Sequence, residues 1–463
     1  MKILIISANT LPASPAGPAY MAGAALRGGH TVEVFETLFS TDVVNDIDEH
    51  VRQFNPDVIG ISIRLVNGYV VDELAKDFEL GIRPFDARPM VKGMVDRIKQ
   101  RSDAQIVLGG PGFNYFGQNW LEYLDLDYGL RGEADHAFPL FLERLEEGAD
   151  INSVPGCIYR QNGRIHKIPR DLVADLDSTA FPAYELFNLA RYREYGISPA
   201  ITSKRGCAFG CTFCPYSSLE GTRYRLKSPG RVVDEIEQVL RVGDSPMIIF
   251  CENSFNVPKS HAEAICHEIL ARKLSVCWGT GALKPLKITD EFIQLMRAAG
   301  CDYINIAIES ASSTMLKGMN RRYKVDDVRE ALNCFARSDI PYGISLMFGC
   351  PGETPETIAD TLEVIDSFPL PPDGVWVTIG ICLWTERQAV VEDARQAGQL
   401  VDDEVAYEEI CRITAFRLLW LRDSTAQRRG VDRSIRPGLH ESGHVVPRGA
   451  GGGGAFSDRW RAH

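Results

Sequence analysis

The sequence has no long hydrophobic run and no excess of positive charge, and each shortage excludes a class of protein. No stretch of its 463 residues approaches the roughly eighteen apolar residues that a membrane helix needs. The apolar run Ile3–Ile6 is too short for the core of a signal peptide. The net charge of −12 argues against non-specific binding to nucleic acid or to anionic membranes. We therefore expect a cytoplasmic protein with no nucleic-acid or membrane partner.

Cysteine is missing from residues 1–156, although the whole chain contains 12 cysteines. Their irregular spacing in a chain of this length does not resemble a disulfide framework. The apolar and charged fractions, 45% and 24%, are ordinary for a folded globular protein. The length is sufficient for two or three domains with cores of their own.

Three of the cysteines, Cys207, Cys211 and Cys214, lie close together on a loop after the apolar run Ala200–Thr202. Thiolates are soft ligands that select iron–sulfur clusters, zinc or copper(I). A zinc site normally needs a fourth ligand nearby, and Cys251 and His261 are far away in the sequence. Three ligands for four irons would leave one iron open to a substrate. Structural cysteines or a zinc site are the alternatives.

This spacing resembles the CxxxCxxC signature of radical S-adenosylmethionine (SAM) enzymes, with the aromatic Phe213 just before the last cysteine. The resemblance implies a 4Fe–4S cluster on the three cysteines, with SAM chelating the open iron. It places Phe213 near the adenine of SAM. Three further candidates for SAM contact lie at strand ends that match the family pattern: Glu252, Asn253 and Glu309.

Residues 1–150 alternate short apolar strands with helix-length segments. Each strand is apolar on both faces, which predicts a doubly wound parallel, Rossmann-like sheet. Ligands of such sheets bind beyond the carboxyl ends of the strands, in the loops that begin at Asn9, Ser62 and Gly109. The expected strands span residues 2–6, 31–35, 58–62 and 106–108.

This region resembles the cobalamin-binding domain that precedes many radical SAM cores. The resemblance rests on two turns, Leu108–Pro111 and Arg131–Glu133, and implies that cobalamin contacts the loops at the strand ends. Glycines there suit either a close ligand or a tight turn. The implied cobalamin contacts are Asn9, Ser62, Gly109, Gly110, Pro111, Gly132 and Glu133.

Two absences qualify this resemblance. The loop Asn9–Ser14 contains no histidine that could become the lower axial ligand of cobalamin, so the axial ligation is unassigned. Methylthiotransferases have a similar layout, but their N-terminal domain supplies cysteines for a second cluster. Because residues 1–156 have none, that alternative is excluded.

Six repeats of strand and helix within residues 197–395 predict a partial (β/α)6 radical SAM barrel, open at one side. Its strands are expected near residues 199–203, 247–251, 276–279, 303–308, 342–348 and 374–379. Ser228 and Thr289 are expected to cap two of its helices. Residues 151–196 read as a connector with a small hairpin, 396–423 as a helical segment and 424–463 as a disordered tail.

Together these features predict a radical SAM enzyme that cleaves SAM to a 5′-deoxyadenosyl radical. The resemblance implies cobalamin-dependent methyl transfer to a carbon of a small metabolite, with an electron donor such as flavodoxin or ferredoxin. Rearrangement, cyclisation or oxidation without methyl transfer is one alternative. A non-catalytic cobalamin or cluster sensor, or an inactive homologue, is the other. The sequence identifies neither the substrate, nor a catalytic residue, nor the oligomeric state.

Overall fold

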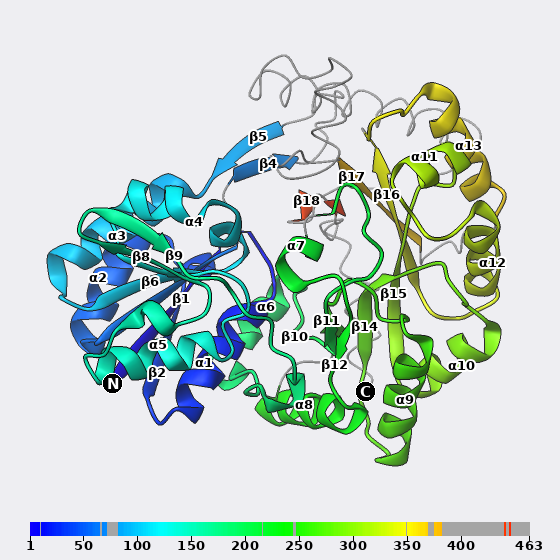
Figure 1. Cartoon of the computed structure of the whole chain (residues 1–463). Coiled ribbons are helices and arrows are strands. Elements are labelled where there is room, and N and C mark those ends of the chain that lie inside the picture. The colour runs from blue at the N-terminus through cyan, green and yellow to red at the C-terminus, as the bar shows by residue number, and fades with distance from the viewer. Residues whose placement is uncertain are drawn as a thin grey trace.

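The computed structural model describes most of the first 368 residues and little of the remainder (Figure 1). The predicted helical segment 396–423 lies outside the described residues. Two short strands, β18 (Leu439–His440) and β19 (His444–Val445), pair within the segment for which the sequence predicts disorder. The described residues are 1–9, 11–64, 67–71, 82–214, 216–243, 247–348, 350–368, 375–381, 439–440 and 444–445.

The first sheet has five parallel strands followed by a hairpin, in the order β2-β1-β3-β6-β7-β8-β9. Successive residues of β1 point to opposite faces, so Leu4 and Ile6 lie in one apolar core and Ile3 and Ile5 in another. Helices α2, α3 and α4 cover the first face, and α1 and α5 cover the second. This arrangement confirms the predicted doubly wound sheet.

The parallel strands are β1 (Lys2–Ala8), β2 (Thr31–Glu36), β3 (Val58–Ile63), β6 (Gln105–Gly109) and β7 (Tyr128–Leu130). The helices are α1 (Ala16–Arg27), α2 (Val43–Phe54), α3 (Arg88–Arg101), α4 (Pro111–Leu124) and α5 (Ala137–Glu146). A separate antiparallel pair, β4 (Asn67–Val71) and β5 (Ile82–Asp86), follows β3.

The hairpin that the sequence places in a connector belongs to this first sheet. β8 (Cys157–Gln161) pairs antiparallel with β7, and β9 (Arg164–Lys167) pairs with β8. The hairpin thereby covers the backbone hydrogen-bonding edge that β7 would otherwise expose. The short helical segment η2 (Ile151–Ser153) precedes the hairpin. After the hairpin, the chain reaches the second sheet through η3 (Leu176–Ser178), η4 (Tyr184–Leu186) and α6 (Leu189–Glu194).

The second sheet consists of six parallel strands in sequence order, β10-β13-β14-β15-β16-β17, which confirms the predicted partial barrel (Figure 1). Ser228, Thr289 and Thr354 each accept a backbone hydrogen bond at the start of a helix, so both predicted caps are present. The strands are β10 (Ala200–Ile201), β13 (Ile248–Phe250), β14 (Trp278–Leu283), β15 (Cys301–Glu309), β16 (Tyr342–Phe348) and β17 (Val375–Ile381). The helices are α8 (Pro229–Val242), α9 (Lys259–Ala271), α10 (Asp290–Ala298), α11 (Ser313–Gly318), α12 (Val325–Ala336) and α13 (Pro355–Asp366).

A buried polar contact joins α1 of the first sheet to α8 of the barrel. Lys227, directly before α8, donates to both carboxylate oxygens of Glu235 at 2.7 and 2.8 Å. Tyr20 of α1 donates to the same carboxylate at 2.9 Å, and Arg231 lies 3.1 Å from it. Both side chains of the Lys227–Glu235 pair are completely buried. Burial lowers the pKa of Lys227, and Glu235 opposes that shift.

Replacing Lys227 by methionine should destabilise the protein strongly, because it removes the main partner of a carboxylate that water cannot reach. We expect the free energy of unfolding to fall by about 3 kcal/mol. The matched control is Lys92→Met, which breaks the half-exposed Lys92–Asp96 pair on α3 and should cost less than about 1 kcal/mol. Urea denaturation followed by tryptophan fluorescence measures both. Equal losses in the two variants would show that the buried contact adds nothing.

Candidate active site

The cysteine loop is closed at its base by a short antiparallel ladder. β11 (Lys204–Arg205) precedes the loop and pairs with β12 (Arg225–Leu226), which follows it and α7 (Tyr216–Glu220). The expected strand 199–203 is therefore shorter than predicted, with the ladder inserted before the cysteines. Gly206 has a φ of +84°, and a Cβ there would lie 2.1 Å from the Arg223 carbonyl oxygen. Only glycine allows the two ends of this loop to approach so closely.

All three cysteines lie on this loop, with Cys207 buried and Cys211 and Cys214 half-buried. Arg321 donates to the Cys211 Sγ at 3.0 Å, and the Tyr224 hydroxyl lies 3.7 Å from the Cys207 Sγ. Burial raises the pKa of the Cys214 thiol to about 11. A bound metal would be needed to keep this sulfur as a thiolate, since coordination deprotonates a thiol outright.

The loop is also attached to the segment that follows α11. The Thr212 N–H donates to the Met319 carbonyl at 3.2 Å, and the Asn320 side chain donates to the Gly210 carbonyl at 2.7 Å. Among the described residues, no group of three or more His, Cys, Asp or Glu side chains is placed to hold a single metal ion. A cluster has a different requirement, because each of its cysteines ligates a different iron. Three cysteines on one loop are compatible with a cluster.

Phe213 contributes to a small apolar cluster beside this loop. It packs against Met315 and Met319 of the α11 segment, Met347 of β16, and Cys350. Cys350 is buried there, which is consistent with a packing role. The flexible, polarisable methionines could follow the shape of a flat aromatic ligand, which is compatible with the proposed place of the adenine.

Glu309 is the last residue of β15 and has two unusual features. Its φ is +57°, a conformation that costs a non-glycine residue about 1–3 kcal/mol, and the register with β16 shifts at this point. Its carboxylate is buried, with one oxygen 3.6 Å from Arg321 and the other without a hydrogen-bond partner. An unpaired buried carboxylate oxygen is ready to accept from a ligand that carries N–H donors. Glu309 therefore fits the amino group of SAM.

Glu252 and Asn253, the other candidates for SAM contact, already have protein partners. Glu252 accepts from the Ser203 hydroxyl at 2.5 Å, and this bond ties the ends of β10 and β13 together. Burial raises the pKa of Glu252. The Asn253 amide donates to Glu220 of α7 at 2.9 Å. Cys251 ends the expected apolar strand 247–251, which predicts a buried small side chain, but the residue is exposed, so that prediction is wrong.

Asn9, Ser62 and the Gly109–Gly110 turn come together at one edge of the first sheet, as predicted. β1 and β3 lie side by side and Ser62 pairs with Gly109 of β6, so their carboxyl ends meet. A Cβ on Gly110 would lie 2.5 Å from the Ile63 carbonyl oxygen, and its φ is +89°. Gly110 is thus required by the turn itself, before any ligand is considered. Pro111 begins α4 immediately after it.

Gly132 and Glu133 follow β7, and the structure gives Glu133 a different set of contacts from those expected. Its carboxylate accepts from both terminal nitrogens of Arg225 and from the Val173 N–H at 2.8 Å. Two residues later, Asp135 accepts from Arg205 at 2.6 and 2.9 Å. Arg205 and Arg225 are the two β11–β12 residues that close the cysteine loop. Glu133 is therefore engaged in holding that loop.

Sequence reasoning missed Asp135, Arg205, Arg225 and Arg321 as site residues. Arg205 stands next to the cysteine signature and could have been noticed for that reason. Its partner Asp135 is 70 residues away, and Arg321 lies 110 residues from Cys211. No local pattern connects such pairs.

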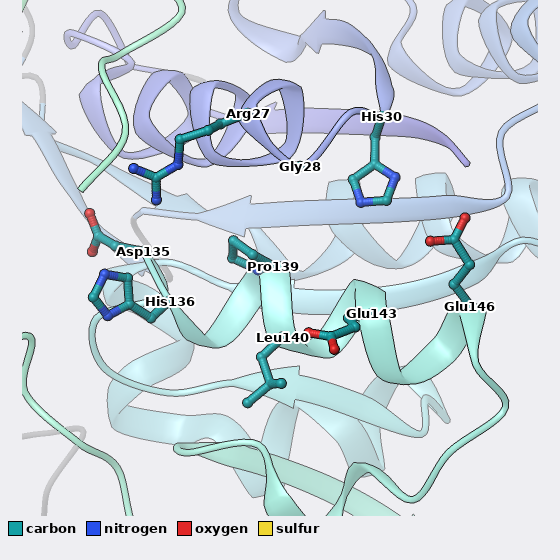
Figure 2. Close-up of a pocket in the computed structure, with 9 residues that line it drawn as sticks. All are labelled: Arg27, Gly28, His30, Asp135, His136, Pro139, Leu140, Glu143 and Glu146. Carbon is teal, nitrogen blue, oxygen red and sulfur yellow. The ribbon is translucent and has the colours of Figure 1, made fainter. Parts of the chain in front are cut away.

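A cavity of about 410 Å³ lies apart from the cysteine loop, between the end of α1 and α5 (Figure 2). Arg27, Gly28 and His30 face Asp135 and residues of α5 across it, and none of the predicted site residues lines it. The Arg27 guanidinium donates to the Ser178 carbonyl at 2.6 Å, and the His136 ring lies 3.2 Å from the Ser178 hydroxyl. The opposing charges of its walls, and these existing contacts, point to no single ligand. The lining residues are Arg27, Gly28, His30, Asp135, His136, Pro139, Leu140, Glu143 and Glu146.

Replacing Cys207, Cys211 or Cys214 by alanine should remove most of the iron and inorganic sulfide from anaerobically reconstituted protein. Each substitution takes away one of only three ligands. The control is Cys251→Ala, which removes a nearby exposed thiol and should leave both contents unchanged. Iron, sulfide and zinc analyses measure the effect. Zinc instead of iron in the parent protein would contradict the cluster.

Comparison with known proteins agrees with this geometry. The profile of the radical SAM superfamily matches residues 201–365, from β10 to the last turn of α13. An uncharacterised methyltransferase of Pyrococcus horikoshii is 25% identical over 386 residues, which cover 78% of this chain and 77% of the relative. The anaerobic magnesium-protoporphyrin IX monomethyl ester cyclase of Rubrivivax gelatinosus is 25% identical over 365 residues, 76% of this chain and 61% of the relative.

Among solved structures, the radical SAM methyltransferase TsrM of Kitasatospora setae superposes with a TM-score of 0.71 at 21% identity. The match covers 86% of this chain and 75% of TsrM, so it spans both sheets and shows that the two proteins share their fold. No helix among the described residues is long and apolar enough to cross a membrane. The cysteine loop and the family match identify residues 201–365 as a radical SAM domain, and the chain as a whole has a fold similar to that of a radical SAM methyltransferase.

Proposed function

We propose that the chain is a cobalamin-dependent radical SAM methyltransferase that methylates a carbon atom of a small molecule. The observation that carries this proposal is that two sets of candidate ligand residues both lie at the carboxyl ends of parallel strands. The cysteine loop and Glu309 lie at the carboxyl ends of the barrel strands, and Asn9, Ser62 and Gly110 lie at the carboxyl ends of the first sheet. Open parallel sheets bind ligands at these ends.

Two tyrosines interact electrostatically with groups that belong to both carboxyl-end edges. Tyr216 follows the cysteine loop. Burial raises its pKa, and Arg64, which follows β3 of the first sheet, partly opposes this rise. The pKa of Tyr115 on α4 is raised by burial first and then by Tyr216 and Cys214. These groups lie close enough to influence one another's charge. The Tyr216 residue is nevertheless 40% exposed.

Each cofactor would have its own residues. Cys207, Cys211 and Cys214 would hold the cluster, and Glu309 would accept the SAM amino group while the Phe213 cluster covers the adenine. When bound, the 4Fe–4S cluster supplies the electron that cleaves SAM, and cobalamin supplies the methyl carrier. The chain orients these groups and excludes water. Cobalamin would lie against the loops that contain Asn9, Ser62, Gly109, Gly110, Pro111 and Gly132.

Relatives support the choice of reaction. TsrM was solved with cobalamin and a [4Fe–4S] cluster, and again with tryptophan as substrate and a SAM analogue. The Pyrococcus relative is named a methyltransferase. A substrate of similar size to an amino acid is therefore the first class to test. A one-electron donor such as flavodoxin or ferredoxin would complete the system.

A second candidate is a radical reaction without methyl transfer. The Rubrivivax cyclase, at the same identity over 76% of this chain, favours it. The two candidates differ in their products, because methyl transfer from SAM yields S-adenosylhomocysteine and radical cyclisation does not. A sensor would bind the cofactors without cleaving SAM.

The reconstituted protein should bind about one cobalamin per chain when it is supplied with hydroxocobalamin under anaerobic conditions. Absorbance after cyanide extraction of the full chain measures this ratio. Incubation with SAM and a reductant should then yield S-adenosylhomocysteine. A ratio near zero with a complete cluster would exclude the methyltransferase and leave the second candidate.

Glu309→Gln should weaken SAM binding by roughly 10- to 100-fold, because a hydrogen bond to a charged group contributes about 1.5–3 kcal/mol. Glutamine keeps the size of the side chain and removes its charge. Equilibrium dialysis of labelled SAM against cluster-loaded protein measures the affinity. Glu330→Gln, an exposed residue of α12, is the control and should bind SAM normally. Unchanged affinity in Glu309→Gln would mean that SAM lies elsewhere.

A further inference from the structure

The buried guanidinium of Arg321 lies between Cys211, a proposed cluster ligand, and Glu309, whose carboxylate is proposed to bind SAM. Its terminal nitrogens donate to the Cys211 Sγ and to the Ala307 carbonyl, both at 3.0 Å. Its Nε donates to the Tyr323 hydroxyl at 2.7 Å, and the Glu309 carboxylate lies at 3.6 Å. The side chain is only 2% exposed. All of these partners belong to the chain itself.

The protein holds this guanidinium in place independently of any ligand. The Tyr323 hydroxyl lies 3.1 Å from the Ala307 carbonyl and 2.8 Å from the Ile308 carbonyl, so it is fixed against the end of β15. Tyr323 and Ala307 then fix two sides of Arg321. The planar fork of arginine loses little freedom when it forms several bonds at once. The N–H that faces Cys211 is therefore directed by the fold.

Anionic and polar partners keep Arg321 charged despite its burial. Burial works against its charge, but Tyr323, Glu309 and Cys211 outweigh that effect and raise its pKa. Lys284 is a second buried cation nearby, and its pKa is lowered by burial and by Arg321, whereas Glu309, Cys211 and Cys207 act in the opposite direction. Among the described residues, Arg321 and Lys284 therefore both interact with the Glu309 carboxylate. A cluster on three thiolates carries net negative charge, and its reduced form carries one charge more.

We propose that Arg321 is a positioning residue that raises the reduction potential of the cluster and couples this potential to SAM binding through Glu309. The inference rests on the proposed function, since it requires the cluster and SAM at these residues. A hydrogen bond and a positive charge at a ligand sulfur stabilise the reduced cluster more than the oxidised one. Reduction adds one electron, supplied by a one-electron donor such as flavodoxin or ferredoxin that thereby becomes oxidised, and no bond forms or breaks.

The coupling follows from the shared carboxylate. When the SAM ammonium engages Glu309, the attraction between Glu309 and Arg321 weakens, and more of the Arg321 charge acts on Cys211. SAM should therefore shift the potential upward in the parent protein relative to a variant without this charge. Linkage requires the reverse effect of equal size, so SAM should bind more tightly to the reduced cluster.

The test is a redox titration of the cluster-loaded full chain, followed by electron paramagnetic resonance, with and without SAM. Arg321→Gln should shift the midpoint to a more negative potential and lose the upward contribution from SAM. Arg322→Gln is the matched control, because it removes the same charge from the neighbouring exposed residue and should leave both values unchanged. Arg321→Lys keeps the positive charge but lacks the planar guanidinium. Its midpoint potential should lie between those of the parent protein and Arg321→Gln.

Tyr323→Phe provides an independent measurement if Arg321→Gln loads its cluster poorly. It releases one side of the guanidinium and should shift the midpoint in the same direction by a smaller amount. Equal midpoints in the parent, Arg321→Lys and Tyr323→Phe proteins would overturn the inference. Absence of a cluster from the parent protein would instead refute the proposed function, so the two failures are distinguishable.

Discussion

The buried ion pairs between the loop after β7 and the β11–β12 ladder are the contacts on which the candidate site depends. Arg205 forms a two-bond contact with Asp135, and Arg225 forms one with Glu133. Burial works to raise the pKa of Asp135, but Arg205 outweighs it and lowers the pKa. Removing water from such charges is costly, so these pairs are weak evidence for stability. Their role here is placement, because they fix the base of the cysteine loop against the first sheet.

The opposite side of the loop is held by the segment after α11. Asn320 and Met319 bind its backbone, and Arg321 binds the Cys211 sulfur. The loop is therefore supported from both halves of the protein, which explains how a short stretch with little regular structure can present three thiols together. A shift of either support would change the distances between the sulfurs. This arrangement makes the relative position of the two halves a property of the site itself.

Local sequence signals predicted the helices and strands, but they could not predict contacts between residues that are far apart in the sequence. Strands such as Tyr342–Phe348 and caps such as Ser228 were predictable because apolar patterns and capping residues act within a few positions. The hairpin at 157–167 was also visible, but its pairing with β7 was not, since any exposed edge could have accepted it. Glu133 looked like a ligand residue because its turn matched a family pattern.

The same limit applies to charge. A carboxylate pairs with whichever guanidinium the fold brings near, and nothing in the sequence around Glu133 names Arg225. Cys251 shows the converse, because an apolar strand predicted burial, whereas the end of β13 leaves its side chain exposed. Strand ends are where ligands enter parallel sheets, so sequence rules for the strand interior fail there first.

The clearest physical argument for a ligand site is the unfavourable free energy of several features around Glu309, which contacts within the protein do not offset. Glu309 carries a strained backbone and a buried oxygen without a partner, and Arg321 and Lys284 add two buried cations beside it. Each feature alone is tolerable, but together they would destabilise a region with no further role. A group that brings an N–H donor to Glu309 and negative charge to the two cations relieves all of them at once. SAM on a thiolate-bound cluster has both properties, which is why the electrostatics of these residues, and not only the cysteine spacing, favour that ligand set.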